Sequence, residues 1–125
     1  MSEVLTVYYA HHLWKYNTPI EDYEIRLIHR AFPNAKIINP NTDIEQGREE
    51  AEIMCDCLST VSKCDIVVFS DMDGVIGKGV YEEVEKAKHV YWIHNDTVLP
   101  FDGTFSILND SGTTRIYAEV AHRLL

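Results

Sequence analysis

Residues 64–83 read CDIVVFSDMDGVIGKGVYEE, and this stretch decides the fold. The apolar run from Ile66 to Phe69 predicts a strand over residues 65–69 that is buried on both faces, as in a parallel sheet. A glycine-rich loop follows at 70–78, and we expect a helix over 79–88. A buried strand that leads through a loop into a helix is typical of one unit of an α/β fold.

The same alternation of strand and helix extends from this stretch in both directions. The β-branched and aromatic run 4–9 predicts an opening strand. Thr18, Pro19 and Glu21 have the spacing of a helix start, with a cap hydroxyl, a proline at the first helical position and a glutamate at the third. The remaining elements are expected as strands at 35–39 and 89–93 and as a helix within 43–63 that Gly47 interrupts near its start.

The βαβαβαβ order predicts an open, mostly parallel sheet of order 2-1-3-4, because its connections are long enough for right-handed crossovers. The last part of the chain differs: residues 98–108 predict a short hairpin around Asp102-Gly103, and 113–124 predict a final helix. We therefore expect residues 1–125 to form a single α/β domain. The predicted architecture is a three-layer α/β/α sandwich of flavodoxin-like type with a C-terminal extension.

Composition limits the classes of function. The chain has 125 residues, 46% of them hydrophobic, and a formal net charge of −9, which disfavours nucleic acid and anionic membrane surfaces as partners. No apolar run approaches the roughly 20 residues of a membrane helix, and the first residues lack the pattern of a signal peptide, so we expect a cytoplasmic protein. Cys55, Cys57 and Cys64 lie close together in an expected helix, a spacing that favours buried, reduced thiols over disulfides or a metal site.

Two loops carry most of the chemistry-bearing side chains. In an open α/β sheet, ligands bind beyond the carboxyl ends of the strands where the strand order reverses, which for this order lies between the first and third strands. The loops that face this crevice are 8–17 and 70–78. Glu82 and Glu83 follow in the first turn of the next helix, where a carboxylate ordinarily complements the helix dipole.

The order of these motifs resembles that of the nucleoside 2-deoxyribosyltransferase-like family over roughly the first 93 residues. Tyr8-Tyr9-Ala10 is similar to the family's Tyr-x-Ala, and Cys64-Asp65-Ile-Val-Val follows a helix. Asp73-Gly74, Gly79-Val-Tyr-Glu-Glu83 and Ala87 are similar to its DG…GxxxE…A signature. The resemblance implies a transferase or hydrolase that acts on the N-glycosidic bond of a nucleoside or nucleoside 5′-monophosphate. It implies no metal and no organic cofactor, and a homo-oligomer.

The resemblance also implies roles for single residues. Glu83 would be the nucleophile at the anomeric carbon of the sugar, and Tyr8 would hydrogen-bond and orient it. Asp73 would bind the sugar hydroxyls or handle a proton. The loop at 70–78 and the start of the helix after it are also expected to bind the substrate, through Asp71, Gly74, Lys78 and Gly79.

The first loop is expected to complete the substrate pocket. Its His11, His12 and Lys15 could donate hydrogen bonds to a 5′-phosphate, and Trp14 could stack on a base. This loop departs from the family, which commonly has Gly-Pro or Gly-Ser here, and Cys57 stands where the family often has an aspartate. These departures favour an alternative in which the crevice binds a nucleotide or an ADP-ribose-like ligand without turning it over.

Residues 66–75 suggest a second alternative, because they resemble the DxDG strand and loop of haloacid-dehalogenase-type phosphatases. In that family the first aspartate, here Asp71, is the phosphoryl nucleophile, and the second, here Asp73, is its acid or base. The chemistry also needs a later lysine and further acidic residues that bind Mg²⁺. The residues after Asp73 contain no acidic pair behind a hydrophobic strand, which favours the glycosidic-bond interpretation.

Overall fold

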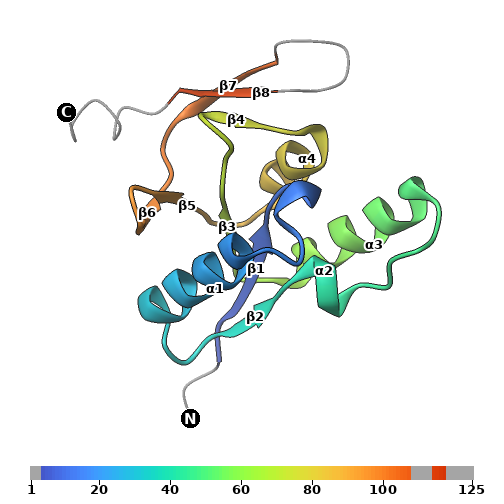
Figure 1. Cartoon of the computed structure of the whole chain (residues 1–125), viewed down its shortest axis with the longest axis horizontal. Helices are drawn as coiled ribbons and strands as arrows, with labels where there is room; N and C mark the ends of the chain where they lie inside the picture. The colour runs from blue at the N-terminus through green and yellow to red at the C-terminus, as the bar shows by residue number, and fades with distance from the viewer. Residues whose placement is uncertain (1–3, 108–113, 118–125) are drawn as a thin grey trace.

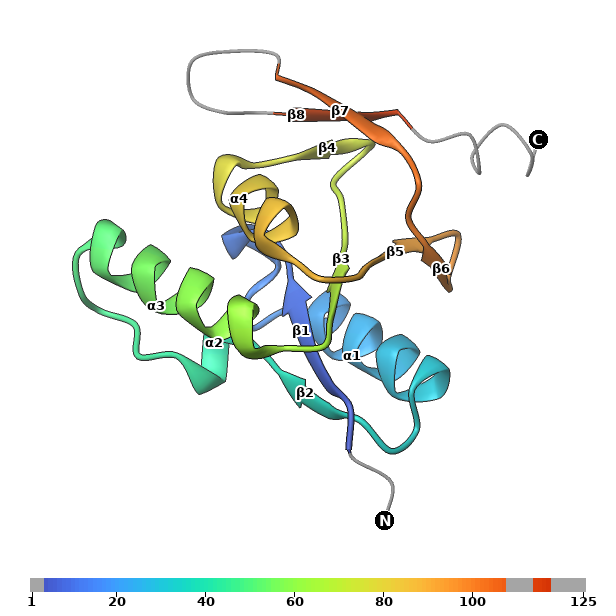
Figure 2. The ribbon, with the colours of Figure 1, turned by 180° about the vertical axis from the view of Figure 1, so that it is seen from behind.

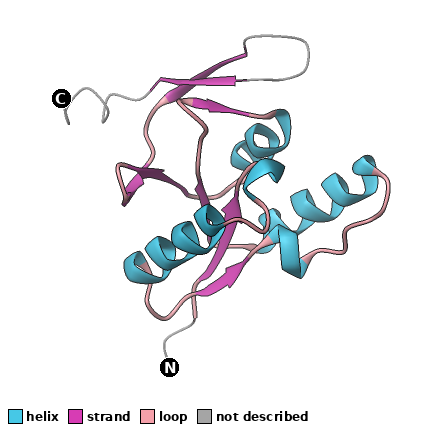
Figure 3. Cartoon of the chain, viewed as in Figure 1, coloured by secondary structure: helices cyan, strands magenta, loops and turns pink. Residues whose placement is uncertain are grey.

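The computed structural model describes residues 4–107 and 114–117 and contains two sheets (Figure 1, Figure 3). The larger sheet has five strands in the order β2-β1-β3-β5-β6, and the smaller has three in the order β4-β8-β7. Four strands of the larger sheet are parallel, and β6 (Thr97–Pro100) runs antiparallel to β5. The parallel strands are β1 (Thr6–Ala10), β2 (Lys36–Ile38), β3 (Ile66–Phe69) and β5 (Val90–His94). The α/β class is therefore confirmed, and the parallel strands lie in the predicted order.

Helices cover both faces of the larger sheet (Figure 2). One face packs against α1 (Pro19–Ala31), and the other packs against α3 (Glu50–Lys63) and α4 (Lys78–Lys86). Successive strand residues point to opposite faces, so Tyr9 joins the core beneath α1 and Tyr8 joins the core beneath α3 and α4. This arrangement is compatible with a three-layer α/β/α sandwich.

The helix starts follow local signals. The Thr18 hydroxyl accepts the backbone N–H of Glu21 at 3.4 Å, so α1 begins where the sequence predicts. The helix predicted within 43–63 starts only at Glu50, because Gly47 has φ 77° and breaks the helical path. A separate short helix, α2 (Pro40–Asp43), precedes this break.

The loop at 70–78 contains a strand that the sequence did not predict, β4 (Val75–Ile76). The backbone reverses at Asp73 and Gly74, whose φ angles are 54° and 82°. Met72 and Val75 exchange backbone hydrogen bonds of 2.9 and 3.1 Å across this turn. Two central residues with positive φ between two such bonds define a type I′ hairpin turn, which Asp-Gly favours strongly.

Two predictions for the C-terminal part are wrong. No hairpin forms at Asp102-Gly103 in the described chain, because β6 and β7 (Thr104–Ile107) belong to different sheets. The hairpin connects β5 and β6 instead, through Asn95 and Asp96, which both have positive φ. The predicted helix 113–124 is replaced at 114–117 by β8 (Thr114–Tyr117), which pairs with β4 and β7, and its remainder lies outside the described residues. Pairing on both sides outweighs local helix preference there.

The smaller sheet lies beyond the carboxyl ends of β1 and β3, as Figure 1 shows. The carboxyl ends of β1 and β3 therefore face three segments: the turn at Asp73 and Gly74 that precedes β4, the N-terminus of α4, and the loop that follows β1. That loop contains a single 3₁₀ turn, η1 (Leu13–Lys15). Among the described residues, no helix has both the length and the apolar character needed to cross a bilayer.

Candidate active site

Tyr8 and Glu83 form a buried pair on the face of the larger sheet that α3 and α4 cover. Tyr8 lies in β1 and is fully buried, and Glu83 lies on α4 and is 5% exposed. The Tyr8 hydroxyl donates a hydrogen bond to Oε2 of Glu83 across 75 positions of the sequence. Val80 and Val84 are buried on the same helix, so this face of α4 packs on the sheet and carries Glu83 with it. The structure thus brings together two residues that the sequence predicts as catalytic.

Glu83 keeps one carboxylate oxygen free. Its Oε2 accepts the hydrogen bond of Tyr8, and Oε1 accepts none from the described residues. One oxygen held in place by Tyr8 and a second without a hydrogen bond from the described residues suit a carboxylate nucleophile.

Burial raises the pKa of Glu83 to about 7, because the charged carboxylate loses its hydration there. The hydrogen bond from Tyr8 acts in the opposite direction, and the negative charge of Glu82 adds to the increase. The pKa of the Tyr8 phenol lies well above its usual range, first because of burial and then because of Glu83, so Tyr8 remains a proton donor. A buried carboxyl group that titrates near neutral pH is characteristic of functional sites.

Cys57 of α3 is the third member of this cluster. Its side chain is buried in the same core as Tyr8, and burial raises the pKa of the thiol so that it stays neutral. Asp56, the next residue along the helix, lies on the outer side of α3, where it pairs with Arg48 at 2.7 Å. A turn of about 100° per residue separates the two side chains. The position where the resemblance leads one to expect a carboxylate is therefore occupied by a thiol.

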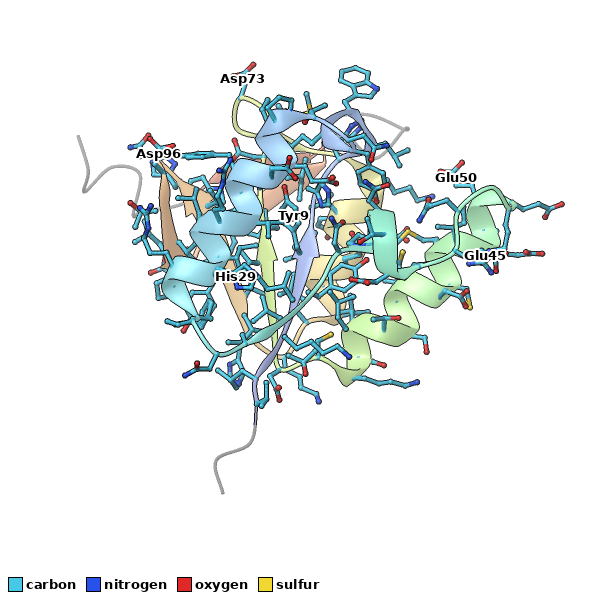
Figure 4. The ribbon with its side chains drawn as sticks, turned by 60° about the horizontal axis from the view of Figure 1, so that its bottom comes forward. Tyr9, His29, Glu45, Glu50, Asp73 and Asp96 are labelled. Atoms are coloured by element: carbon cyan, nitrogen blue, oxygen red, sulfur yellow. The ribbon has the colours of Figure 1, made fainter. Side chains whose placement is uncertain are left out.

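A second polar cluster lies on the α1 face of the same strand. The Tyr9 hydroxyl donates to Glu24, and Lys15 Nζ lies 3.1 Å from Oε2 of that carboxylate. The Ser70 hydroxyl donates to Glu24 at 2.8 Å and accepts from Lys15 at 2.9 Å. Figure 4 shows Tyr9 inside the molecule between α1 and the sheet. Buried side chains from β1, η1, α1 and the end of β3 are thus tied into one network.

Sequence reasoning missed Glu24 and Ser70. The only available signal for Glu24 was its position, because it lies three and four residues before Leu27 and Ile28, the most buried apolar residues of α1. A carboxylate on the apolar stripe of a helix requires a buried partner. That partner, Lys15, comes from another element, so no local sequence pattern predicts the pair.

His11 is also part of the α1 face. Its ring stacks on Tyr9 at a centroid distance of 3.7 Å, and Nε2 lies 2.7 Å from Oε2 of Glu21. Its Nδ1 lies 3.1 Å from the backbone carbonyl of Tyr9, and burial lowers the pKa of His11 against the opposing effects of these two contacts. Burial acts to raise the pKa of Glu21, but hydrogen bonds from His11, the Asn17 amide and Asn41 outweigh it and lower that pKa.

The other predicted substrate-binding residues are placed differently. His12 accepts the backbone N–H of Trp14 at 3.1 Å and caps η1, and the Trp14 side chain is 76% exposed. Lys78 is solvated and reaches Glu82 only at 4.0 Å. Gly79 lies within α4 against Met54 of α3, so it serves the packing of two helices rather than a phosphate loop. The structure does not bring these side chains to Glu83 as a group.

Asp71 and Asp73 have separate roles in the hairpin loop. Asp71 accepts the indole N–H of Trp92 at 2.8 Å on one oxygen and the Gly74 amide at 2.6 Å on the other. Asp73 is exposed at the tip of the turn, as Figure 4 shows, and Gly74 supplies the second positive φ of that turn. Both carboxylate oxygens of Asp71 thus hold the loop in shape, which gives the phosphatase interpretation no support.

Two hollows lie at the opposite edge of the sheet. One, of about 360 Å³, is lined by Asp65, Lys88 and His89 among others, and a second, of about 410 Å³, lies between residues 4–5 and 31–35. Neither is lined by Glu83 or Tyr8. The Glu83 cluster joins a buried carboxyl group of raised pKa to a hydrogen-bond partner from another element, so the chemistry of the chain favours it as the functional site. No group of three or more His, Cys, Asp or Glu side chains in the described ranges could hold a metal ion.

Comparison of the chain with protein-family models, with curated proteins and with solved structures finds no match.

Proposed function

We propose that the protein is an N-glycosidic-bond enzyme, a nucleoside deoxyribosyltransferase or a nucleoside or nucleotide N-glycosidase, with Glu83 as its nucleophile. The observation that carries this proposal is the Tyr8–Glu83 pair. Tyr8 holds Oε2, Oε1 accepts no hydrogen bond from the described residues, and burial raises the pKa of the carboxyl group to about 7. The pair lies on a helix-covered face of the parallel sheet, and the loops that follow β1 and β3 begin a few residues beyond Tyr8.

The proposed reaction has two steps. Oε1 of Glu83 bonds to the anomeric carbon, the bond from that carbon to the base nitrogen breaks, and the bonding electron pair leaves with the base. Water or a second base then displaces the carboxylate from the sugar. Tyr8 donates a hydrogen bond to the same carboxylate throughout, which fixes its orientation and lowers the pKa that burial raises.

Three further expectations accompany this proposal: a sheet of flavodoxin-like type, a cytoplasmic location and a homo-oligomeric state. The order of the parallel strands, with helices on both faces, supports the first. The free thiols of all three cysteines are consistent with a reducing compartment. Leu13 and Trp14 are large apolar side chains exposed at the tip of the first loop, and such residues are enriched at interfaces.

Release of free base tests the proposal. Purified protein is incubated with deoxy- and ribonucleosides and their 5′-monophosphates, and the products are separated by chromatography. Glu83→Gln keeps the size of the side chain and removes the nucleophile, so we expect base release to fall by about three orders of magnitude or more. Glu85→Gln is the matched control, since it removes an exposed carboxylate of the same helix. Equal release by the wild type and Glu83→Gln would exclude Glu83 as the nucleophile.

A non-catalytic nucleotide- or ADP-ribose-binding module is the second candidate, and Cys57 favours it. The neutral thiol beside Tyr8 provides no charge that could bind sugar hydroxyls strongly or assist proton transfer. Ligand-dependent stabilisation in a thermal-shift assay, without any free base in the same samples, would support this candidate.

A further inference from the structure

The cations that the sequence offers for phosphate binding already have partners. The Lys15 ammonium group donates to Glu24, to the Ser70 hydroxyl and to the backbone carbonyl of Asp71, at 3.1, 2.9 and 2.9 Å. These three acceptors use all three of its protons. Because Lys15 is also buried, a phosphate could recruit it only by breaking the network that surrounds it.

Neither histidine of the first loop is free to bind a phosphate. His11 is bound to Glu21, and His12 accepts a backbone N–H through Nδ1, which requires that nitrogen to be unprotonated. Burial lowers the pKa of both imidazoles, and nearby Lys15 lowers that of His12 further. Lys78 stands in solvent beside Glu82. No free cation from the predicted set therefore faces Glu83.

Anionic groups dominate this edge instead. Tyr16 lies between the two clusters, with its ring 4.8 Å from that of His11. Its pKa is raised by burial and then by Glu83, Cys57 and Glu21, and Glu82 likewise acts on Glu83. Lys78, which is 69% exposed, comes only within 4.0 Å of Glu82.

Exposed lysines gather at the other edge of the sheet. Lys63 ends α3, Lys86 ends α4, Lys36 begins β2 and Lys88 comes just before β5. Helices of a parallel α/β fold run opposite to the strands, so their C-termini and the cations that complement them meet at the amino ends of the strands. The charge distribution thus gives the molecule a negative end at Glu83 and a positive end far from it.

We propose that the Glu83 site takes phosphate-free nucleosides, and prefers those whose base is quaternised, and so positively charged, at the nitrogen of the glycosidic bond. This inference rests on the proposed function and narrows its substrate class. A phosphate would meet carboxylates without a free cation, whereas a cationic base gains attraction from the same charges. The phenol ring of Tyr16, whose pKa Glu83 also raises, offers a π face of the kind that binds such cations.

The chemistry of the leaving group leads to the same class. Among the described groups, Tyr8 is the donor that contacts Glu83. Its hydroxyl proton is engaged in the hydrogen bond to Oε2, so Tyr8 is not available to protonate a departing base. A quaternised base needs no proton. When Oε1 of Glu83 bonds to the anomeric carbon, the glycosidic electron pair moves to the ring nitrogen, cancels its charge and releases a neutral base. Water then attacks the glycosyl ester, giving the free sugar, the Glu83 carboxylate and one proton.

The test uses three ligands that differ in charge. Nicotinamide riboside carries a quaternised base, its reduced dihydro form is a neutral analogue of similar size, and its 5′-monophosphate adds a phosphate. Binding to the wild-type protein is measured by calorimetry, and base release is followed by chromatography. We expect the riboside to bind about tenfold more tightly than either other ligand and to be cleaved with about a tenfold higher kcat/KM than its monophosphate. Glu82→Lys should reduce the preference over the monophosphate by about fivefold.

The outcomes separate this inference from the proposed function. Equal or tighter binding of the monophosphate, or of the neutral form, would overturn the inference even if base is released. Tighter binding of the riboside without any base release would support the ligand class while the proposed function fails. Absence of measurable binding by all three ligands would overturn the inference.

Discussion

Replacing Glu83 by glutamine is expected to make the protein more stable at alkaline pH while it abolishes base release. Folding raises the pKa of Glu83 from an ordinary value of 4.5 to about 7, mainly because burial removes water from the charged form. The folded protein therefore holds this proton more tightly than the unfolded chain. The stabilisation is complete below pH 4.5 and is lost as the pH rises to 7.

The size of the effect follows from the change in pKa. A rise from 4.5 to about 7 corresponds to about 3 kcal/mol in the free energy of unfolding. Glutamine has nearly the shape of the protonated acid and can still accept the Tyr8 hydrogen bond. We therefore expect Glu83→Gln to match the wild type within about 1 kcal/mol at pH 4.5 and to exceed it by up to about 3 kcal/mol at pH 8.

Urea unfolding at several pH values between 4.5 and 8 measures this difference. Comparing the two proteins at each pH removes the contributions of other titrating groups, including His11 and Glu21, whose pKa values also change on folding. Glu85→Gln is the control, because it changes an exposed carboxylate of the same helix that does not act on the pKa of Glu83. A stability difference between Glu83→Gln and the wild type that stays constant across this range would refute the reasoning, since it would mean that Glu83 titrates alike in both states.

Three more predictions concern neighbouring residues. Tyr8→Phe should lower kcat for base release about 10- to 100-fold, and it should move the midpoint of the pH–rate profile upward, because the Tyr8 hydrogen bond lowers the pKa of Glu83. A midpoint that moves downward would contradict this. Lys15→Met should lower the free energy of unfolding, measured in urea, by about 3–5 kcal/mol, because it leaves Glu24 buried without its cation. The double variant with Glu24→Gln should recover most of this loss. Asp73→Ala should change stability by no more than about 0.5 kcal/mol and base release by no more than about twofold, because the side chain is exposed; a hundredfold loss of activity would place Asp73 in the site after all.

Part of the candidate site could be predicted from the sequence. Tyr8 and Glu83 were named because the sequence resembles the Tyr-x-Ala and DG…GxxxE motifs of a known family. The expectation that Glu82 and Glu83 lie in the first turn of a helix is wrong, because α4 begins at Lys78 and its first turn holds no acidic residue. The pairing of Lys15 with Glu24 could not be predicted, because it depends on how a loop folds against a helix. Phosphate binding by His11, His12 and Lys78 depended on the charge of each side chain and on where it points. Both are decided by hydrogen bonds and burial in the folded protein.

The sequence by itself determined the α/β class, the order of the parallel strands and the start of α1. These features follow from apolar runs, from the lengths of the connections between strands and from a helix cap, all of which can be recognised in short stretches of sequence. Tertiary structure alone decided that 114–117 pairs as β8, that the hairpin forms at Asn95 and Asp96, and that Asp71 holds its own loop. It also decided that Glu83 titrates near neutral pH, because burial and a hydrogen bond from a residue 75 positions away set the free energy of its charge.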